Sequence, residues 1–339
     1  MNAVFRCDAT EQTGLGHLSR CISLAEALRQ SGVSCTFAGQ FNDAAIGQIS
    51  GAGCDWEGLT APVNDAAAER KFAKLVAENC PDFVVLDSYR ADEALLAHLN
   101  SLGCKTVLID DFCALESYPC DALLNFTVGA GSLGYPTGPA LILGPKYFLA
   151  RRRLVEQRPM SIRRTRQGAA RNLLVAIGGT DPKGIAARVI QLLHDAQIET
   201  CLRALAPESP QLTALISDFL PGSSILPRLP DLSEQLLWAD AAITGGGLIK
   251  YESAFMGVPA AAIAQNEGQN GESQAFERAG LVFDLGLADE VGDEELLVAL
   301  RRFISDDALR GAMMGHMRAA FPPDPTANAA EEILEVMRN

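Results

Sequence analysis

The sequence lacks any CxxC pair and has only four histidines, all far apart, so it offers no evident set of metal ligands. Its nine cysteines are odd in number and dispersed, and most have apolar or small neighbours. Reduced thiols that act as small core residues fit this pattern better than a zinc site or a disulfide framework. We therefore expect neither a metal nor a cofactor.

Positive charge and long apolar runs are also scarce. There are 28 Lys and Arg against 42 Asp and Glu, which gives a net charge of −14 and argues against general binding of nucleic acid or anionic lipid. No apolar run reaches the roughly 20 residues that a membrane-spanning helix needs. The N-terminus has no basic segment followed by an apolar run. We expect a cytoplasmic monomer with no nucleic-acid partner and no membrane insertion.

What the chain does contain is apolar strands that alternate with helices. Its 339 residues, 48% of them hydrophobic, can build two cores. In the N-terminal half the periodicity predicts strands at 3–7, 33–37, 83–87 and 106–111, and helices at 18–28 and 91–102. Strands that are apolar on both faces and separated by helices are typical of a parallel sheet covered on each side.

A second α/β half follows an arginine-rich stretch. We expect an N-terminal domain at 1–155, a linker at 156–171 with solvated arginines, and a C-terminal domain at 172–339. Pro182 predicts a helix start. The last helix is a candidate to return to the first domain. The second half predicts strands near 172–177, 200–205, 224–226, 241–244, 258–264 and 281–284, and late helices near 294–304, 307–319 and 327–337.

Three glycine-containing turns join predicted strands to helices, at 13–17, 178–181 and 245–247. Glycine lets the backbone approach a ligand, and the first helical amides then face a phosphate, although tight packing of helix on strand also uses glycine. The first turn lacks the third glycine of GxGxxG, and no Walker lysine follows any turn. These departures argue against a simple dehydrogenase or a P-loop ATPase.

The first turn carries the strongest catalytic candidate. His17 stands beside Gly14 and Gly16 at a helix start, where the positive end of the helix disfavours imidazolium. We interpret it as a neutral general base; a satisfied core histidine is the competing interpretation. The residues at the ends of two predicted strands should lie along the rim of one cleft: Asp87, Ser88, Tyr89, Asp110 and Asp111. The aspartates can orient the histidine or sugar hydroxyls, or cap a helix: Asp8, Asp87, Asp110 and Asp111.

The second and third turns suit a nucleoside diphosphate. If the two domains confront each other across a cleft, the Gly245, Gly246 and Gly247 turn, with Leu248 opening the helix, can hold a diphosphate. Glu252 then reaches a ribose hydroxyl pair, unless it is an ordinary surface glutamate. The second turn, Gly178, Gly179 and Thr180, is assigned to the same nucleotide.

These segments together resemble the UDP-sugar hydrolases of pseudaminic acid biosynthesis. Those enzymes release UDP from UDP-2,4-diacetamido-2,4,6-trideoxy-β-L-altropyranose. The resemblance reaches to about residue 285 and rests on Phe5-Arg6-Cys7-Asp8-Ala9, Gly14-Leu15-Gly16-His17-Leu18-Ser19-Arg20-Cys21, Leu24-Ala25, Leu86-Asp87-Ser88-Tyr89, Ile109-Asp110-Asp111, Leu123-Leu124-Asn125, Leu143-Gly144-Pro145-Lys146-Tyr147, Ile177-Gly178-Gly179-Thr180-Asp181 and Gly257-Val258-Pro259.

The resemblance implies a GT-B-like α/β fold, like that of MurG-type glycosyltransferases, with two Rossmann-like domains whose parallel sheets face a central cleft. It implies that His17 directs water at the anomeric carbon, with loss of UDP and inversion, and without a metal. Tyr89 takes the place of the active-site tyrosine and Gln269 that of a glutamine near the diphosphate and sugar. Sugar contacts are assigned to Gly14, Gly16, Arg20, Asp8, Tyr89, Asp87 and Gln269, and UDP contacts to Gly178, Gly179, Thr180, Gly245, Gly246, Gly247, Leu248 and Glu252.

The chain departs from the family pattern at two points. Leu248-Ile249-Lys250-Tyr251 follows the glycines where a hydroxyl-bearing residue is expected, and Gly268 stands where an asparagine often precedes the glutamine. The exact sugar stays open. The alternative functions are a GT-B glycosyltransferase that uses the same UDP-sugar donor and a non-catalytic nucleotide-sugar sensor, against which the intact His17 loop argues.

Overall fold

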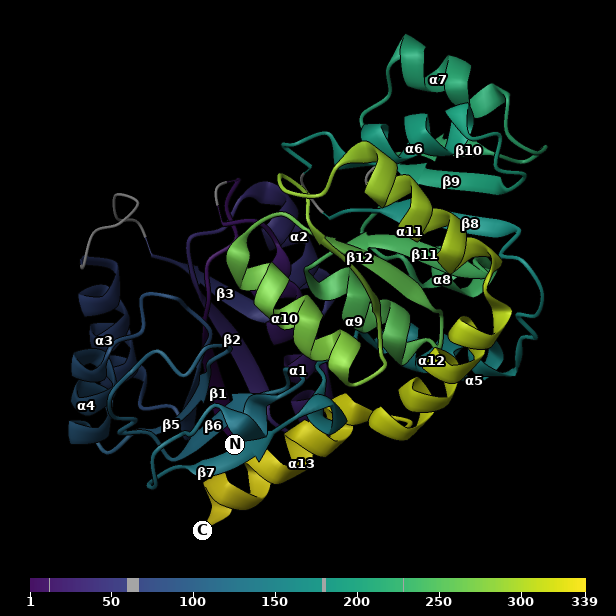
Figure 1. Cartoon of the computed structure of the whole chain (residues 1–339). Coiled ribbons are helices and arrows are strands. Elements are labelled where there is room, and N and C mark those ends of the chain that lie inside the picture. The colour runs from purple at the N-terminus through teal and green to yellow at the C-terminus, as the bar shows by residue number, and fades with distance from the viewer. Residues whose placement is uncertain (12, 60–66, 179–180, 228) are drawn as a thin grey trace. The chain divides into compact units, whose positions relative to one another are not determined.

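The structure, a computed structural model, describes residues 1–11, 13–59, 67–178, 181–227 and 229–339. The chain divides into two compact units (Figure 1). Unit 1 comprises Met1–Arg152 and Asp324–Asn339, and unit 2 comprises Arg153–Pro323. Each unit is built around one parallel sheet, so the predicted class of two α/β domains with parallel sheets is confirmed.

Unit 1 contains a seven-stranded parallel sheet in the order β3-β2-β1-β4-β5-β6-β7. The chain winds outward from β1 to one edge and then returns to add β4 on the other side of β1. In such sheets ligands bind beyond the carboxyl ends of the strands where the winding reverses. The strands are β1 (Asn2–Arg6), β2 (Ser34–Gly39), β3 (Asp55–Gly58), β4 (Phe83–Leu86), β5 (Lys105–Ile109), β6 (Ala122–Asn125) and β7 (Ala140–Leu143).

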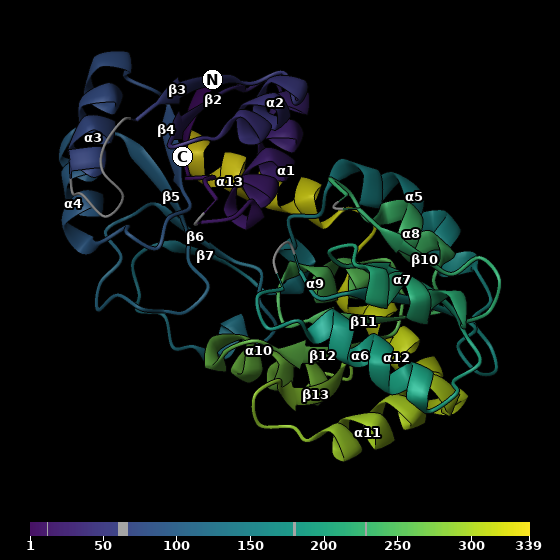
Figure 2. The ribbon, with the colours of Figure 1, turned by 90° about the horizontal axis from the view of Figure 1, so that it is seen from above.

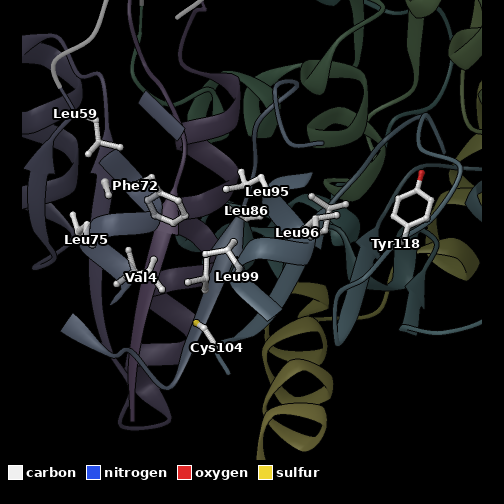
Figure 3. Close-up of a cluster of buried hydrophobic side chains, with 14 of the residues drawn as sticks. Val4, Leu59, Phe72, Leu75, Leu86, Leu95, Leu96, Leu99, Cys104 and Tyr118 are labelled. Atoms are coloured by element: carbon white, nitrogen blue, oxygen red, sulfur yellow. The ribbon is translucent and has the colours of Figure 1, made fainter. Parts of the chain in front are cut away.

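Helices cover both faces of this sheet because the strands are apolar on both sides. The face that bears Val4 and Leu86 packs against Phe72 of α3 and Leu96 and Leu99 of α4 in one buried cluster (Figure 3). Helix α13 packs against α1, β6 and β7 (Figures 1 and 2). The helices of unit 1 are α1 (Gly16–Gln30), α2 (Asp43–Gly51), α3 (Ala67–Asn79), α4 (Glu93–Ser101) and α13 (Pro325–Arg338).

The C-terminal helix is held in unit 1 by specific bonds as well as by apolar burial. Asp324 caps it by accepting a hydrogen bond from the Ala327 amide at 2.9 Å. Thr326 donates to the Ala150 carbonyl at 2.9 Å, and Lys105 donates to the carbonyl of Met337 at 3.0 Å. Residues 324–339 therefore complete the first unit.

Unit 2 repeats the same winding in a six-stranded parallel sheet, in the order β10-β9-β8-β11-β12-β13. Its reversal lies between β8 and β11. The strands are β8 (Asn172–Ala176), β9 (Cys201–Leu205), β10 (Ser224–Leu226), β11 (Ala241–Gly245), β12 (Ala260–Ala264) and β13 (Phe283–Leu287). The helices are α5 (Arg152–Arg163), α6 (Ile185–Asp195), α7 (Pro210–Ser217), α8 (Ser233–Trp238), α9 (Leu248–Phe255), α10 (Glu267–Arg278), α11 (Asp293–Ser305) and α12 (Asp307–Ala320).

The segment 156–171, expected to be a linker with solvated arginines, is different in the structure. Its first half belongs to helix α5, and Arg158 and Arg166 are both buried. Arg158 donates to the carbonyls of Phe255 and Phe321, each at 2.7 Å, and Arg166 donates to Ala239 at 2.9 Å. The prediction of solvated arginines is wrong for these two side chains. A guanidinium carries five donors, so it can be buried where several carbonyls converge, which only the fold decides.

Helix α6 begins at Ile185 rather than at the predicted Pro182. The carboxylate of Asp181 accepts hydrogen bonds from the Ile185 and Ala186 amides at 2.9 and 2.8 Å. Asp181 thus caps the helix from four residues upstream, and the intervening residues form a turn. Across the described residues, no helix is both long and apolar enough to cross a membrane.

Candidate active site

The candidate site of unit 1 lies where the winding of its sheet reverses, beyond the carboxyl ends of β1 and β4. Gly14, with a positive φ of 72°, turns the chain after β1, and its amide donates to the Thr10 carbonyl at 3.0 Å. Helix α1 then begins at the exposed Gly16, with no side-chain cap and no acidic residue in its first turn. His17 is the second residue of this helix. The sequence places it at a helix start, and the sheet order places it at the reversal point.

His17 is held by a buried carboxylate. Its Nδ1 lies 2.6 Å from Oδ1 of Asp87, which directly follows β4. A carboxylate only accepts hydrogen bonds, so Nδ1 carries a proton, and in the neutral form of the ring the lone pair lies on Nε2. This is the tautomer that a general base needs. Of the strand-end aspartates, Asp87 is thus the one that pairs with His17.

Arg20 fixes the carboxylate in turn. Its Nε donates to Oδ2 of Asp87 at 2.7 Å, and its Nη2 donates to Oδ1 at 2.6 Å. Its Nη1 donates to both oxygens of Asp111, at 2.9 and 2.8 Å. Nη2 of Arg20 also lies 3.3 Å from His17 Nδ1. Both nitrogens donate to Oδ1 of Asp87, so this contact is not a hydrogen bond. One guanidinium thus holds the strand-end carboxylates of β4 and β5.

Asp87 is ionised in this arrangement. Burial alone would raise its pKa, but the charges and hydrogen bonds of Arg20 and His17 hold the pKa of Asp87 well below its usual range. A lowered folded-state pKa means that ionised Asp87 stabilises the fold above its unfolded pKa of about 3.9, and that this stabilisation disappears as the pH falls through the folded value.

We expect the Asp87→Asn variant to have a lower free energy of unfolding than wild type at pH 7, and the difference between them to shrink as the pH falls below about 4. The reason is that below about pH 4 Asp87 takes up a proton in the unfolded wild-type chain but stays ionised in the folded one, so its contribution to the free energy of unfolding falls. Urea unfolding of both proteins from pH 7 to pH 3 measures this difference. A difference that stays constant over this range would contradict the assignment.

Tyr89 lies against the histidine. Its ring meets the His17 ring edge-on, with centroids 4.5 Å apart, and 71% of the residue is exposed. Phe112, three residues beyond β5, lies next to Tyr89 with ring centroids 5.8 Å apart and is 56% exposed. The structure thus brings His17, Arg20, Asp87 and Tyr89 together and adds Phe112.

Asp8 belongs to a separate buried network. Arg6, in the last position of β1, is fully buried and donates to both oxygens of Asp8, at 2.7 and 3.1 Å. It also donates to Glu69 of α3 at 2.7 Å, and the Gln40 amide donates to Asp8 at 2.8 Å. Both carboxylate oxygens of Asp8 are therefore occupied by the protein. Asp8 holds the loop after β1 in place and is not placed as a sugar ligand.

In unit 2 the reversal point carries the third glycine turn. A Cβ on Gly245 would lie 2.0 Å from the Ile177 carbonyl oxygen, so the end of β11 runs directly beside the residue before Gly178. Helix α9 then begins at Leu248, with Gly247 as its N-cap, no side-chain cap and no acidic residue in its first turn. Its first amides thus face no protein carboxylate on their own turn, which suits an anion.

The other predicted nucleotide turn is different. Gly178 follows β8 closely, but Asp181 occupies the first amides of α6, so that helix end is already capped by a carboxylate. Gly179 and Thr180, both assigned to UDP from the sequence, lie outside the described residues. Of these two helix starts, that of α9 is the one without a carboxylate cap.

Gln269 lies beside the glycine turn. A Cβ on Gly246 would be 2.7 Å from the Cβ of Gln269. The Gln269 side chain accepts from the Gln265 amide at 3.0 Å, and its own amide donates to Asn266, the N-cap of α10. Glu252 is buried with 7% exposure, so the alternative of an ordinary surface glutamate is excluded. Unit 2 thus gathers Gly245, Gly246, Gly247, Leu248 and Gln269, with Glu252 one turn along α9.

Lys250, which departs from the family pattern, is fully buried beneath this turn. Its Nζ donates to the Gly246 carbonyl and pairs with Glu272 Oε2 of α10 at 2.8 Å. The Tyr251 hydroxyl donates to the other oxygen of Glu272. Burial lowers the pKa of Lys250 although the charge of Glu272 opposes this shift. The Lys250 to Glu272 pair therefore ties the glycine turn to the helix that carries Gln269.

We expect Glu272→Gln to destabilise unit 2 by about 1–3 kcal/mol, because the buried Lys250 ammonium then lacks a charged partner. Lys250→Met alone should destabilise unit 2 less than Glu272→Gln does. The double variant Lys250→Met, Glu272→Gln should be more stable than the single variant Glu272→Gln. Urea unfolding of the four proteins of this double-mutant cycle gives the coupling energy. Additive losses would show that the pair contributes nothing.

Several of these residues were not found from the sequence. No local pattern indicates a role for Arg6, Glu69, Phe112 or Glu272, and Lys250 stands out only because a hydroxyl-bearing residue is expected in its segment. A single arginine inside an otherwise apolar strand is a usable signal, because a buried guanidinium requires an acidic partner. In the part of the chain that the structure describes, no group of three or more His, Cys, Asp or Glu is arranged to hold a metal ion.

No family model matches the chain. The spore coat polysaccharide biosynthesis protein SpsG of Bacillus subtilis (strain 168) is 26% identical over 311 residues, which cover 89% of this chain and 89% of that protein. The UDP-2,4-diacetamido-2,4,6-trideoxy-beta-L-altropyranose hydrolase of Campylobacter jejuni (serotype O:2) is 23% identical over 206 residues, 58% of this chain and 68% of that enzyme.

Solved structures resemble the chain over its full length. MurG from Acinetobacter baumannii has a TM-score of 0.73 at 14% identity and covers 100% of this chain and 99% of its own. LpCGTa in complex with UDP has a TM-score of 0.69 at 12% identity, and the match covers 100% of this chain and 99% of LpCGTa. The spinosyn forosaminyltransferase SpnP has a TM-score of 0.66 at 12% identity, and the match covers 100% of both chains. At these identities the likeness concerns the fold alone: the chain has a GT-B-like fold of two Rossmann-like domains.

Proposed function

We propose that this chain hydrolyses a UDP-linked, acylated amino-deoxysugar at its anomeric carbon, as a step of pseudaminic acid biosynthesis. The candidate substrate is UDP-2,4-diacetamido-2,4,6-trideoxy-β-L-altropyranose. The observation that carries the proposal is the 2.6 Å bond between His17 Nδ1 and ionised Asp87, which leaves Nε2 as the proton acceptor. The position of this oriented histidine at the reversal point of a Rossmann-like sheet supports a role in chemistry on a ligand rather than in packing.

The proposed reaction needs one base and one stabilised leaving group. His17 Nε2 takes a proton from water while the water oxygen forms a bond to the anomeric carbon. The bond between that carbon and the UDP oxygen breaks, and its electron pair leaves with UDP, so the configuration inverts. Asp87 stabilises the imidazolium that forms without itself taking the proton. The products are the free sugar and UDP.

The glycine turn of unit 2 supports the nucleotide part of this proposal. Helix α9 begins with Leu248 behind Gly247, and neither a side-chain cap nor an acidic residue competes for its first amides. A diphosphate bound there is stabilised by these amides and by the helix dipole, which matters most as charge develops on the leaving group. We assign Glu252 to the ribose and Gln269 to the diphosphate and sugar.

Similarity to named proteins supports the substrate class. The Campylobacter jejuni relative is named for hydrolysis of this UDP-sugar, and a structure of similar fold holds UDP. The second candidate function, a GT-B glycosyltransferase, is favoured by the similar fold of a forosaminyltransferase. In that reaction His17 takes its proton from an acceptor hydroxyl instead of water, and the donor site is the same.

Incubation with UDP-sugars in ¹⁸O-labelled water distinguishes these reactions. The substrates are UDP-2,4-diacetamido-2,4,6-trideoxy-β-L-altropyranose and UDP-N-acetylglucosamine, and both products are analysed by mass spectrometry. Hydrolysis at the anomeric carbon places one labelled oxygen in the free sugar and none in UDP. Label in UDP would contradict the mechanism, and UDP release that requires an added hydroxyl acceptor would establish transfer instead.

A further inference from the structure

An exposed aromatic pair adjoins the proposed base and has no part in the mechanism described above. Tyr89 is 71% exposed and Phe112 is 56% exposed, and their ring centroids are 5.8 Å apart. Tyr89 also contacts His17, with centroids at 4.5 Å. Scattered exposed apolar residues are normal on a protein surface, but two adjoining aromatic rings beside a histidine base form one continuous apolar surface next to the reacting centre.

The loop that carries Phe112 is held by hydrogen bonds to the two residues that precede the ring. The Phe112 amide donates to Asp110 Oδ1 at 3.0 Å, and the other oxygen of Asp110 accepts from the Tyr118 hydroxyl at 2.7 Å. Asp111 receives two hydrogen bonds from Arg20. The exposure of Phe112 is therefore a property of a fixed loop, whose backbone cannot easily turn the ring into the core.

The same guanidinium sets the position of the ring and of the base. Arg20 binds Asp111, the residue before Phe112, and it also binds Asp87, which orients His17. Both carboxylates lie at the ends of neighbouring parallel strands, β4 and β5. The apolar surface and Nε2 of His17 are thus fixed relative to each other through one buried side chain. Such fixed geometry is what a site needs in order to position a reacting carbon.

We propose that Phe112 and Tyr89 form the subsite for the apolar edge of the sugar, which selects a C6 methyl group over a C6 hydroxymethyl group. This inference rests on the proposed function, because its ligand is the sugar of a UDP-sugar. A hydroxymethyl group laid on two aromatic rings loses hydrogen bonds to water that the rings cannot replace, whereas a methyl group gains burial. The subsite therefore belongs to 6-deoxy sugars.

Binding of two matched nucleotides tests the subsite. The probes are UDP-2-acetamido-2,6-dideoxyglucose and UDP-N-acetylglucosamine, which differ only by the oxygen on C6. Calorimetry is done in the His17→Gln background, in which turnover is blocked, with and without Phe112→Ala. Phe112→Ala is expected to weaken binding of the 6-deoxy nucleotide about tenfold, and to change the affinity for the 6-hydroxy nucleotide and for UDP by less than about twofold.

Two control variants separate the subsite from a general loss of apolar surface. Phe112→Tyr keeps the ring and should retain most of the selectivity. Trp56→Ala removes another exposed aromatic, 43% exposed on β3, and should change neither affinity. Because Phe112 is more than half exposed, Phe112→Ala should unfold at the same temperature as its parent within about 2 °C.

The outcomes distinguish this inference from the proposed function. Equal affinities for the two nucleotides before and after Phe112→Ala, or equal weakening of both, would overturn the subsite while leaving hydrolysis intact. If His17→Gln binds UDP but neither UDP-sugar, the proposed function and the subsite fail together. If Phe112→Ala loses the preference for the 6-deoxy nucleotide while Phe112→Tyr and Trp56→Ala keep it, the subsite is established. This holds whether the wild-type enzyme transfers the sugar to water or to a hydroxyl.

Discussion

His17→Gln is expected to lower kcat about a thousand-fold, within the range that one general base contributes, while UDP binds with unchanged affinity. Glutamine keeps the size and polarity of the side chain but has no lone pair basic enough to take a proton from water. Asp87→Asn should lower kcat roughly a hundred- to ten-thousand-fold, because the amide no longer enforces the tautomer with its proton on Nδ1. UDP release gives kcat, and calorimetry with UDP gives the affinity.

A matched control is available in the same unit. His98 is an exposed residue of α4, so the variant His98→Gln should retain full activity. If His17→Gln and His98→Gln have similar kcat values, His17 is not the base. If His17→Gln loses activity and UDP affinity together, its effect is on folding or binding, and the separation of base and nucleotide site between the two units is wrong.

Gly245→Ala is expected to destabilise unit 2 by about 3 kcal/mol or more. The added Cβ would lie 2.0 Å from the Ile177 carbonyl oxygen and 3.1 Å from its carbon. Both atoms belong to the backbone that continues β8, which pairs with β11, so neither can move without breaking the sheet at its reversal point. Urea unfolding, with hydrogen exchange followed separately in each unit, measures the loss and assigns it.

Gly247→Ala provides the control, because no heavy atom lies within 4 Å of a Cβ added there and its φ of −91° suits any residue. It should unfold like wild type. Equal stability of the two alanine variants would mean that β11 and the residue after β8 do not approach as closely as described. Faster exchange in both units of Gly245→Ala would contradict a local effect. Gly39 in unit 1, whose Cβ would meet the Cys7 carbonyl oxygen, offers an independent repeat.

Much of the fold follows from local patterns along the chain. The period of apolar residues predicted β1, β4, β5 and the three last helices to within a few residues, because each of these elements buries a regular stripe or a continuous apolar run. The patterns failed where polar side chains are buried. Arg158 and Arg166 read as solvated charge but fill positions among backbone carbonyls that distant segments supply.

The candidate site divides in the same way. A histidine between glycines and a helix start can be recognised in the sequence, because backbone freedom and the first helical amides are local properties. The partner of that histidine cannot be recognised. Asp87 was one of several strand-end aspartates, and sheet order alone decides that β4, and not β5, lies next to β1. Asp110, an equally plausible candidate, instead fixes the Phe112 loop.

The sequence by itself determined that the chain is an α/β protein of two parallel sheets, that His17 lies at the start of a helix after a glycine turn, and that glycines precede α9. These features depend on residues close together in the chain. Only the tertiary structure decided that Asp87 orients His17, that Arg20 holds two carboxylates, that Lys250 is buried against Glu272, and that Phe112 adjoins Tyr89. These contacts join residues far apart in the chain, and the order of the strands brings them together.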